Sequence, residues 1–342
     1  MLTNNNALSA KAKAMYGRRL TVEDYEELLH KRNVSEIAAY LKNQTKYSEV
    51  LSDVKENSVH RGQLEIMLKR DSFNRRNKLY RYADKSHQEF YNMSSEKEEI
   101  AQILACLRAL ISNDYSNFVS DLPLFMNKSM SIDMRDLLSV KSVKDLVKVI
   151  KHTAYYGDIA EYLEAEDIHY ATIEHTLNLY YYRHLNEVVE KHFKGDSRKE
   201  ILKIVNQSIE LKNIAKIYRM KEYYHSPPER VRNGMLDCKP QISKQLYEQL
   251  FDAKDGTKVL QLLEQTPYKI KVGNEDFVFI EQYARQINYD SGHRLMNFST
   301  DPSVVYLAYF LLEESEVENL INIIEGVRYG VVASQIQKLL IY

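Results

Sequence analysis

The chain has 342 residues, and its 47 basic and 48 acidic residues give a formal net charge of −1. This balance excludes a global attraction to nucleic acid or to an anionic membrane surface. The low content of 10 glycines and 6 prolines favours helices joined by short loops. A chain of this length is too long for one core and suits two or three domains. Composition therefore predicts an all-α protein of several domains.

Neither a signal peptide nor a membrane-spanning helix is expected. The first ten residues lack an apolar core of signal-peptide length. The longest uncharged apolar run, 302–312, is well short of the roughly 20 residues that a span requires. Cys106 and Cys238 have no metal or redox spacing and are expected to be reduced and buried. These features predict a cytoplasmic protein with no direct membrane insertion.

A sequence pattern occurs three times, at 20–47, 132–155 and 242–268. Each copy has an apolar pair, then an amphipathic run, then a threonine two residues before a tyrosine. The apolar pairs are Leu28 and Leu29, Leu137 and Leu138, and Leu250 and Phe251. The closing pairs are Thr45/Tyr47, Thr153/Tyr155 and Thr266/Tyr268. The copies are 109 and 113 residues apart, which predicts three similar domains, since about 110 residues can hold a core.

Each copy is predicted to form a helical hairpin. Thr21 and Ser243 stand where a helix N-cap belongs, and the second helix of the first copy includes 34–41. A hairpin of this size exposes an apolar face and must pack on another element. We therefore expect each hairpin to be fastened to the rest of its domain.

In chain order, the remaining pattern predicts mostly long helices. One begins within 1–19, and another extends from about Arg61 to Asn92. Capping boxes at Ser95–Glu98 and Ser197–Glu200 are expected to open two more. Further predictions are a tyrosine-rich helix at 168–193, a helix capped by Asp301 with Pro302 at its first position, and either a small β-hairpin or an extended loop at 269–280.

The repetition extends beyond the hairpins. An apolar residue followed by glutamate opens a longer helix in each unit: Leu64-Glu65, Ile173-Glu174 and Ile280-Glu281. The pattern Glu210-x-x-Asn213 also aligns with Glu316-x-x-Asn319, and the first unit matches least well there. The predicted units are 1–130, 131–233 and 234–342, with a linker at Ser226-Pro-Pro and the possibility of a pseudo-threefold arrangement.

Motifs for catalysis or cofactor binding are not found. The sequence has no glycine-rich phosphate loop and no nucleophile elbow. Of the four histidines His169, His175, His184 and His192, only His184 shares a helix face with Glu187, whereas a metal site needs three or four ligands. We therefore predict no catalytic, cofactor-binding or metal residues, and interpret the histidines as solvated or hydrogen-bonded.

A basic stretch at 69–85 interleaves Arg and Lys with Phe73, Tyr80 and Tyr82. Such a stretch resembles a nucleic-acid or phosphate-binding surface. A solvated helix face is the simpler interpretation, and a contact with an acidic protein partner is the next. From the residues alone the chain is a helical interaction protein with a threefold repeat.

Three segments carry a resemblance to a known family: AKAKAMYGRRLTVEDYEELL at 10–29, YLKNQTKY at 40–47 and ENLINIIEGVRYG at 318–330. In their order and with the threefold repeat, they resemble the C subunit of the V/A-type rotary ATPases, the counterpart of the d subunit of the eukaryotic vacuolar proton pump. Lys11 and Lys13 stand where many members have Arg, and the cap of the second unit is shifted by about one residue.

The resemblance implies a funnel of three helical bundles around a pseudo-threefold axis. It implies a non-catalytic rotor subunit of the central stalk, a spacer and socket between the central axle subunits (D and F type) and the membrane proteolipid ring. Such a subunit is peripheral to the membrane on its cytoplasmic side and transmits torque for ATP-driven H⁺ or Na⁺ transport. No nucleic-acid partner and no cofactor are implied.

Arg61, Arg328 and Tyr329, near the unit ends, are the residues we expect to lie toward the axle socket. Two other hypotheses remain. One is a soluble helical scaffold or adaptor that binds protein or RNA through 69–85. The other is an enzyme that uses the region of His184 and Glu187.

Overall fold

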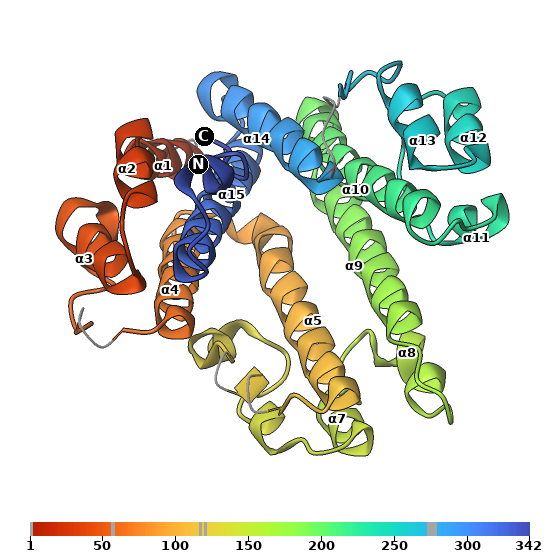
Figure 1. Cartoon of the computed structure of the whole chain (residues 1–342), viewed down its shortest axis with the longest axis horizontal. Helices are drawn as coiled ribbons and strands as arrows, with labels where there is room; N and C mark the ends of the chain where they lie inside the picture. The colour runs from red at the N-terminus through yellow and green to blue at the C-terminus, as the bar shows by residue number, and fades with distance from the viewer. Residues whose placement is uncertain (1–2, 56–58, 116–117, 120–121, 272–278) are drawn as a thin grey trace.

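The computed structural model describes residues 3–55, 59–115, 118–119, 122–271 and 279–342. Within these ranges the chain forms helices and loops but no strand, so the all-α prediction is confirmed (Figure 1). The α-helices are α1 (Thr3–Tyr16), α2 (Val22–Leu29), α3 (Val34–Gln44), α4 (Arg61–Tyr80), α5 (Gln88–Ser112), α7 (Val143–Ile150), α8 (Tyr156–Leu163), α9 (Tyr170–His192), α10 (Gly195–Glu222), α11 (Pro228–Asn233), α12 (Lys244–Asp252), α13 (Gly256–Leu263), α14 (Ile280–Phe298), α15 (Pro302–Arg328) and α16 (Ala333–Gln337). Short 3-10 helices are Lys46–Ser48, Lys85–His87, Leu124–Ser129 and Asp136–Ser139.

The three predicted hairpins are present. The first hairpin is α2 and α3, and the third is α12 and α13. Thr21 and Ser243 cap α2 and α12 as predicted, because their hydroxyl oxygens accept the backbone N–H groups of the third residue in each helix.

The second hairpin differs in its first arm, which is the short 3-10 helix Asp136–Ser139 instead of an α-helix. Its second arm is α7. No Ser or Thr precedes the first arm at the cap position. Instead, the Asp133 carboxylate accepts the Arg135 backbone N–H at 2.9 Å and closes a turn. Leu138, the second residue of the apolar pair, is consequently 37 % exposed, whereas Leu29 is buried.

The predicted end of one long helix and two helix starts predicted from capping boxes are wrong. The helix expected over 61–92 ends at Tyr80, and α5 begins at Gln88, because the Asp84 carboxylate accepts the Ser86 N–H at 3.0 Å and starts a 3-10 turn. Ser95 therefore lies inside α5 and caps nothing.

The other predicted box is also not formed, since α10 already begins at Gly195 and the Ser197 hydroxyl donates to Asp301. By contrast α1, α9 and the start of α15 agree with prediction: Asp301 caps α15 with Pro302 at its first position. Most of the segment predicted as a hairpin or loop, residues 272–278 of 269–280, lies outside the described residues.

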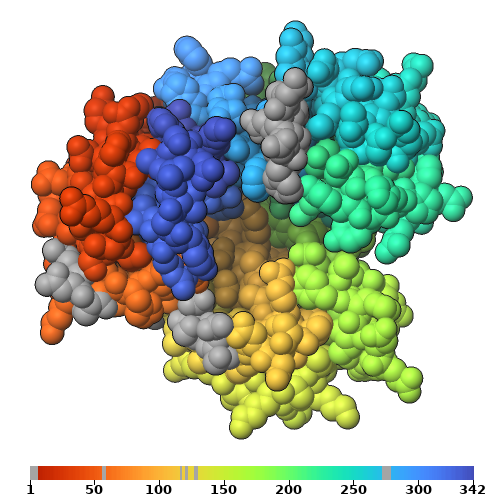
Figure 2. Space-filling view, viewed as in Figure 1, coloured from red at the N-terminus to blue at the C-terminus, as the bar shows by residue number. Residues whose placement is uncertain are grey.

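Each hairpin packs on the C-terminal half of a long helix. The second hairpin packs on α5 and the third on α10, the long helices that precede them in the chain. The first hairpin packs on α15, the last long helix, in a core that includes Leu320, Ile323 and Ile324. The hairpins occupy three outer corners of the molecule (Figure 1), which form three lobes around a central hollow (Figure 2).

The last residues of the chain lie beside the first hairpin and α15 (Figure 1). The tyrosine ring of the last residue, Tyr342, stacks on Tyr25 of α2 with centroids 4.5 Å apart. The unit bounds 1–130, 131–233 and 234–342 and the pseudo-threefold, funnel-like arrangement remain predictions, and the positions of the hairpins are consistent with them.

Candidate functional site

The second hairpin is fastened to α5 by one buried glutamate. Glu99 is 2 % exposed, and its carboxylate accepts hydrogen bonds from the Tyr155 hydroxyl at 2.6 Å and the Ser131 hydroxyl at 2.6 Å. It also accepts the backbone N–H groups of Ser131 and of Ile132, the latter at 3.2 Å. Tyr155 ends the hairpin and Ile132 begins it, so a single carboxylate holds both ends.

The third hairpin is fastened to α10 in the same way. Glu210 is fully buried, and its carboxylate accepts the Tyr268 hydroxyl at 2.5 Å. The backbone N–H groups of Gln241 and Ile242 donate to it at 2.9 and 3.0 Å. We call each such glutamate an anchor, together with the tyrosine hydroxyl and the backbone N–H groups that donate hydrogen bonds to it.

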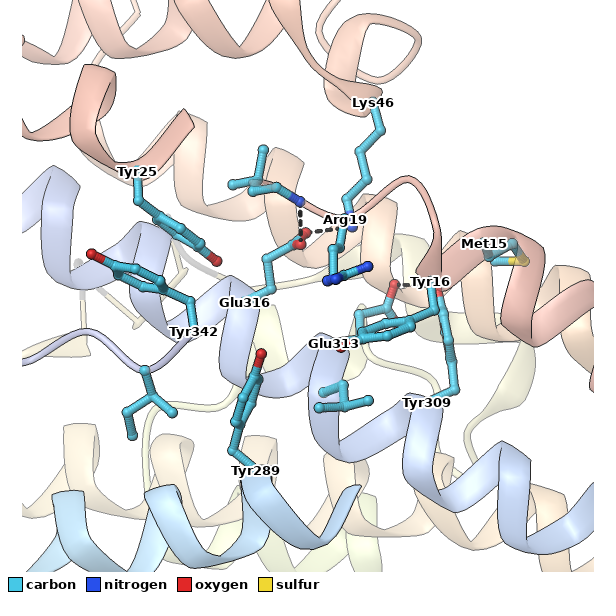
Figure 3. Close-up of a pocket in the computed structure, with 13 residues that line it drawn as sticks. Met15, Tyr16, Arg19, Tyr25, Lys46, Tyr289, Tyr309, Glu313, Glu316 and Tyr342 are labelled. Carbon is cyan, nitrogen blue, oxygen red and sulfur yellow. Dashed lines mark hydrogen bonds and ion pairs between the residues drawn. The ribbon is translucent and has the colours of Figure 1, made fainter. Parts of the chain in front are cut away.

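The first anchor joins the start of the chain to its last long helix (Figure 3). Glu316 of α15 accepts the Tyr47 hydroxyl at 2.6 Å and the Leu20 N–H at 2.9 Å. This anchor has an additional cation, because the ammonium group of Lys46 forms a buried ion pair with the same carboxylate. Burial opposes ionisation of Glu316, but Lys46 and these hydrogen bonds outweigh it and hold the carboxyl pKa below its usual value.

The repeated threonine and tyrosine have distinct roles in the anchors. The threonine hydroxyls of Thr45, Thr153 and Thr266 donate to carbonyl oxygens of the preceding helix at 2.6 to 2.7 Å. They satisfy the helix end and set the direction of the chain. Burial, reinforced by the adjacent glutamate, raises the pKa of each anchor tyrosine well above its usual value. Each tyrosine therefore remains a neutral donor.

The aligned asparagines fasten a second segment. Asn213 of α10 donates to the Leu236 carbonyl at 2.8 Å and accepts its N–H at 2.9 Å. Asn319 of α15 makes the same pair with Ile341, at 2.6 and 3.0 Å. The C-terminal segment around Ile341 therefore occupies the place that the segment before the third hairpin occupies on α10.

A cavity of about 680 Å³ lies among α5, α9, α10, α14 and α15. Its charged lining is largely paired: the ion pairs are Arg219–Glu281 at 3.1 Å, Arg285–Glu318 at 2.8 Å and Lys97–Glu314 at 3.3 Å. Each of these pairs joins two different helices. Five long helices, α5, α9, α10, α14 and α15, thus meet around one cavity that has charged groups in its lining.

A second cavity, of about 30 Å³, lies beside the first anchor between α1, α14 and α15 (Figure 3). It is large enough for about one water molecule. Glu313 lines it, with its carboxylate 3.0 Å from the Tyr309 hydroxyl and 3.9 Å from Arg75 Nε. This cavity is a polar gap in the packing around the anchor and has no room for a substrate.

The three predicted contact residues gather at one place. Arg61, at the start of α4, and Arg328, at the end of α15, both pair with Glu325. The Arg328 guanidinium lies 5.1 Å from the ring centroid of Tyr329, which is 69 % exposed. The structure thus brings the three residues together, and their contact with a partner remains a prediction.

The histidines of α9 do not converge on a common point. His184 lies 2.9 Å from Glu96 and His192 lies 2.5 Å from Glu89, so both face glutamates of α5. His169 lies 3.5 Å from Asp167, and burial lowers the pKa of His175. Within the ranges that the structure describes, no three His, Cys, Asp or Glu side chains are grouped to hold a metal ion.

The basic stretch 69–85 is partly an interior surface. Arg75 pairs with Asp71, and its guanidinium also donates to the Lys46 carbonyl at 3.3 Å. The Arg76 guanidinium covers the ring of Phe310 on α15, 5.2 Å from the centroid. Two of its arginines therefore help to pack α4 on α15 and the first hairpin.

Sequence reasoning identified the anchor tyrosines as repeated residues but assigned them no partner. Glu210 and Glu316 were aligned with each other, whereas Glu99 was missed. Its segment reads Glu99-x-x-Gln102, with glutamine in the place of the asparagine. An alignment that required the glutamate and allowed either asparagine or glutamine three residues later would have found Glu99.

No helix in the described part of the chain combines the length and the apolar character needed to cross a membrane. Residues 8–339 match the model of the ATP synthase (C/AC39) subunit family. The chain is 22 % identical over 335 residues to the C subunit of the A-type ATP synthase of Archaeoglobus fulgidus, covering 96 % of this chain and 94 % of that protein. It is 23 % identical over 330 residues to the C subunit of the A-type ATP synthase of Methanosarcina mazei, covering 94 % and 88 %. The chain therefore belongs to the ATP synthase (C/AC39) subunit family.

Proposed function

We propose that this chain is a non-catalytic rotor subunit in the central stalk of a V/A-type ATPase. It acts as the spacer and socket that joins the central axle to the membrane proteolipid ring, and it transmits torque for ATP-driven H⁺ or Na⁺ transport. In this role it is peripheral to the membrane on the cytoplasmic side. Its partners are the axle subunits of D and F type and the ring, and it needs no cofactor.

The cavity of about 680 Å³ among α5, α9, α10, α14 and α15, called the central cavity from here on, carries this proposal. It is lined by long helices from all three predicted units, so a partner segment held there touches every unit at once. Torque transmission needs rigid elements, and the anchors provide rigidity because each glutamate binds the tyrosine at one end of a hairpin and a backbone N–H at the other. The absence of a phosphate-binding loop from the sequence agrees with a part that hydrolyses nothing.

Native mass spectrometry tests the proposal, with the chain mixed with purified axle subunits and detergent-solubilised proteolipid ring. One copy of the chain bound to both partners at once supports the coupling role. A folded monomer that binds neither partner contradicts it, and salt-dependent RNA binding by that monomer would favour the adaptor hypothesis.

The cluster of Arg61, Arg328 and Tyr329 is proposed to lie toward the axle socket. Arg328→Glu reverses a charge that is half-exposed and so leaves the core intact. Weaker binding of axle or ring by this variant supports the assignment, and unchanged binding of both contradicts it.

A further inference from the structure

Two lysines on the cavity side of α10 differ from the other basic residues around them. Lys212 and Lys216 are one helical turn apart, so their side chains lie on the same face, and both line the central cavity. Lys97, Arg219 and Arg285 in the same lining each have a glutamate partner. Among the described residues, neither Lys212 nor Lys216 forms an ion pair.

Lys216 is held in a partly buried position. A Cβ atom at Gly234 would come within 3.3 Å of its Cε, so the segment after α11 packs closely on its stem. Burial lowers the pKa of its ammonium group, and Arg219 adds to the effect, while Glu174 of α9, which also lines the cavity, opposes it from beyond ion-pair distance. A half-buried ammonium without a carboxylate is unfavourable in the isolated chain and gains from an incoming one.

Lys212 is exposed and forms no ion pair with a described residue, although its charge, from beyond ion-pair distance, adds to that of Lys97 in lowering the pKa of Glu314 against the effect of burial. The Lys212 ammonium group lies 5.7 Å from the ring centroid of Tyr182, a cation–π contact at the cavity wall. The acidic side chains opposite, on α14 and α15, are already occupied by Arg219, Arg285 and Lys97. The described lining has five basic and four acidic side chains, so its net charge is positive, and the two lysines without an ion pair there both lie on α10.

We propose that Lys212 and Lys216 receive a pair of carboxylates from the partner segment that enters the central cavity. The inference rests on the proposed function, in which that segment is the tip of the axle. Because the two lysines are spaced i and i+4, the matching partner is a helix end or turn with two acidic residues three or four positions apart. A cavity in the size range of about 300 to 1,000 Å³ admits such an end rather than the full width of a helix.

Isothermal titration calorimetry of purified axle subunits into the full chain tests this inference. Lys216→Glu and Lys212→Glu are each expected to weaken binding by about tenfold or more, since close charge pairs at interfaces make contributions of this size. The salt dependence of binding is expected to become shallower in both variants. Lys203→Glu is the matched control, because Lys203 is exposed on the same helix outside the cavity and its reversal is expected to change the affinity little.

The outcomes separate the inference from the function on which it rests. If the wild-type chain binds the axle and both reversals bind equally well, the inference is overturned and the proposed function stands. If the wild-type chain does not bind the axle, the proposed function fails and the inference with it. Should a reversal unfold the chain, Lys216→Gln carries the test, with a smaller loss of affinity expected and an unchanged affinity contradicting the inference.

Discussion

The anchor glutamates combine burial with an almost complete set of hydrogen bonds. Glu99, Glu210 and Glu316 are all buried, and each accepts at least one backbone N–H and one tyrosine hydroxyl. A buried carboxylate is tolerable only when donors replace its water shell, and hydrogen bonds to charged acceptors are the stronger kind. Loss of one donor is therefore expected to be costly even though the carboxylate keeps others.

Tyr155→Phe tests the cost of losing one hydrogen-bond donor to the carboxylate of the second anchor. The variant keeps the ring and removes the hydroxyl, so the free energy of unfolding is expected to fall by about 2 kcal/mol. Urea denaturation followed by circular dichroism measures the change. Tyr224→Phe is the control, because Tyr224 is 75 % exposed and its variant is expected to match the wild type. Equal stabilities for all three proteins would contradict the role of the anchor.

Glu313 gives a pH-dependent prediction. Burial raises its pKa to about 7 from the ordinary value of 4.5, against the opposing effect of Lys46, Arg76 and Arg75. The folded state thus binds the proton more tightly than the unfolded state, so this group's contribution to stability is full below pH 4.5 and is lost as the pH rises through 7.

Glu313→Gln stays neutral at every pH. The stability of this variant relative to wild type is therefore expected to rise by about 2 kcal/mol between pH 5 and pH 8. Denaturation curves at both pH values measure the difference, with the exposed Glu264→Gln as a control that is expected to show no such rise. The same difference at both pH values would argue against a raised pKa at Glu313.

At the scale of elements, local capping chemistry decides where the helices begin. The second helix of each hairpin starts after Asn33, Ser142 or Asp255, and each side chain accepts a backbone N–H of its helix. All three stand four residues after the second apolar residue of the repeat. This signal was present in the sequence, whereas the patterns at Ser95 and Ser197 matched a capping box but lay within helices that begin earlier.

Close packing of the third hairpin on α10 depends on a glycine. A Cβ atom at Gly256 would lie 2.8 Å from Glu222 Cβ and 2.9 Å from Tyr218 Cε2. Gly256→Ala is therefore expected to cost about 1–3 kcal/mol of stability through overpacking. Gly157→Ala in α8 is the control, since a Cβ there meets nothing within 4 Å, and it is expected to stabilise the chain by about 0.5 kcal/mol. Thermal unfolding of both variants checks the opposite signs, and equal effects would contradict the packing argument.

At the scale of the whole molecule, the first hairpin packs on the last long helix, α15, and on the C-terminal segment of the chain. The period of the repeat predicted three hairpins in chain order, and the two matching helix patterns identified α10 and α15 as related. The sequence did not reveal that the first hairpin packs on α15, because a linear pattern does not show which of several similar helices a hairpin contacts. Helices α5, α10 and α15 each carry an anchor glutamate that accepts a tyrosine hydroxyl, and the extra ion pair of Lys46 with Glu316 distinguishes the first anchor.

Removal of residues 338–342 tests whether the C-terminal segment stabilises the first hairpin. The deletion abolishes the hydrogen bonds between Asn319 and Ile341 and the stacking of Tyr342 on Tyr25. Backbone amides of α2 are therefore expected to exchange with solvent faster, while those of α12 and α13 keep the wild-type rate. Hydrogen exchange with mass spectrometry reads both regions in one experiment. Equal acceleration in all hairpins, or none in α2, would contradict the role of the C-terminal segment.

The claim that the central cavity is the socket for the axle is tested most directly by site-specific photo-crosslinking. A photoreactive amino acid at Asn178, which lines the cavity on α9, is compared with one at Val22, which is 49 % exposed on the first hairpin. In a complex with the axle subunits, the account predicts an efficient crosslink to the axle from position 178 and little from position 22. A complex that forms normally but crosslinks only from position 22 would contradict it.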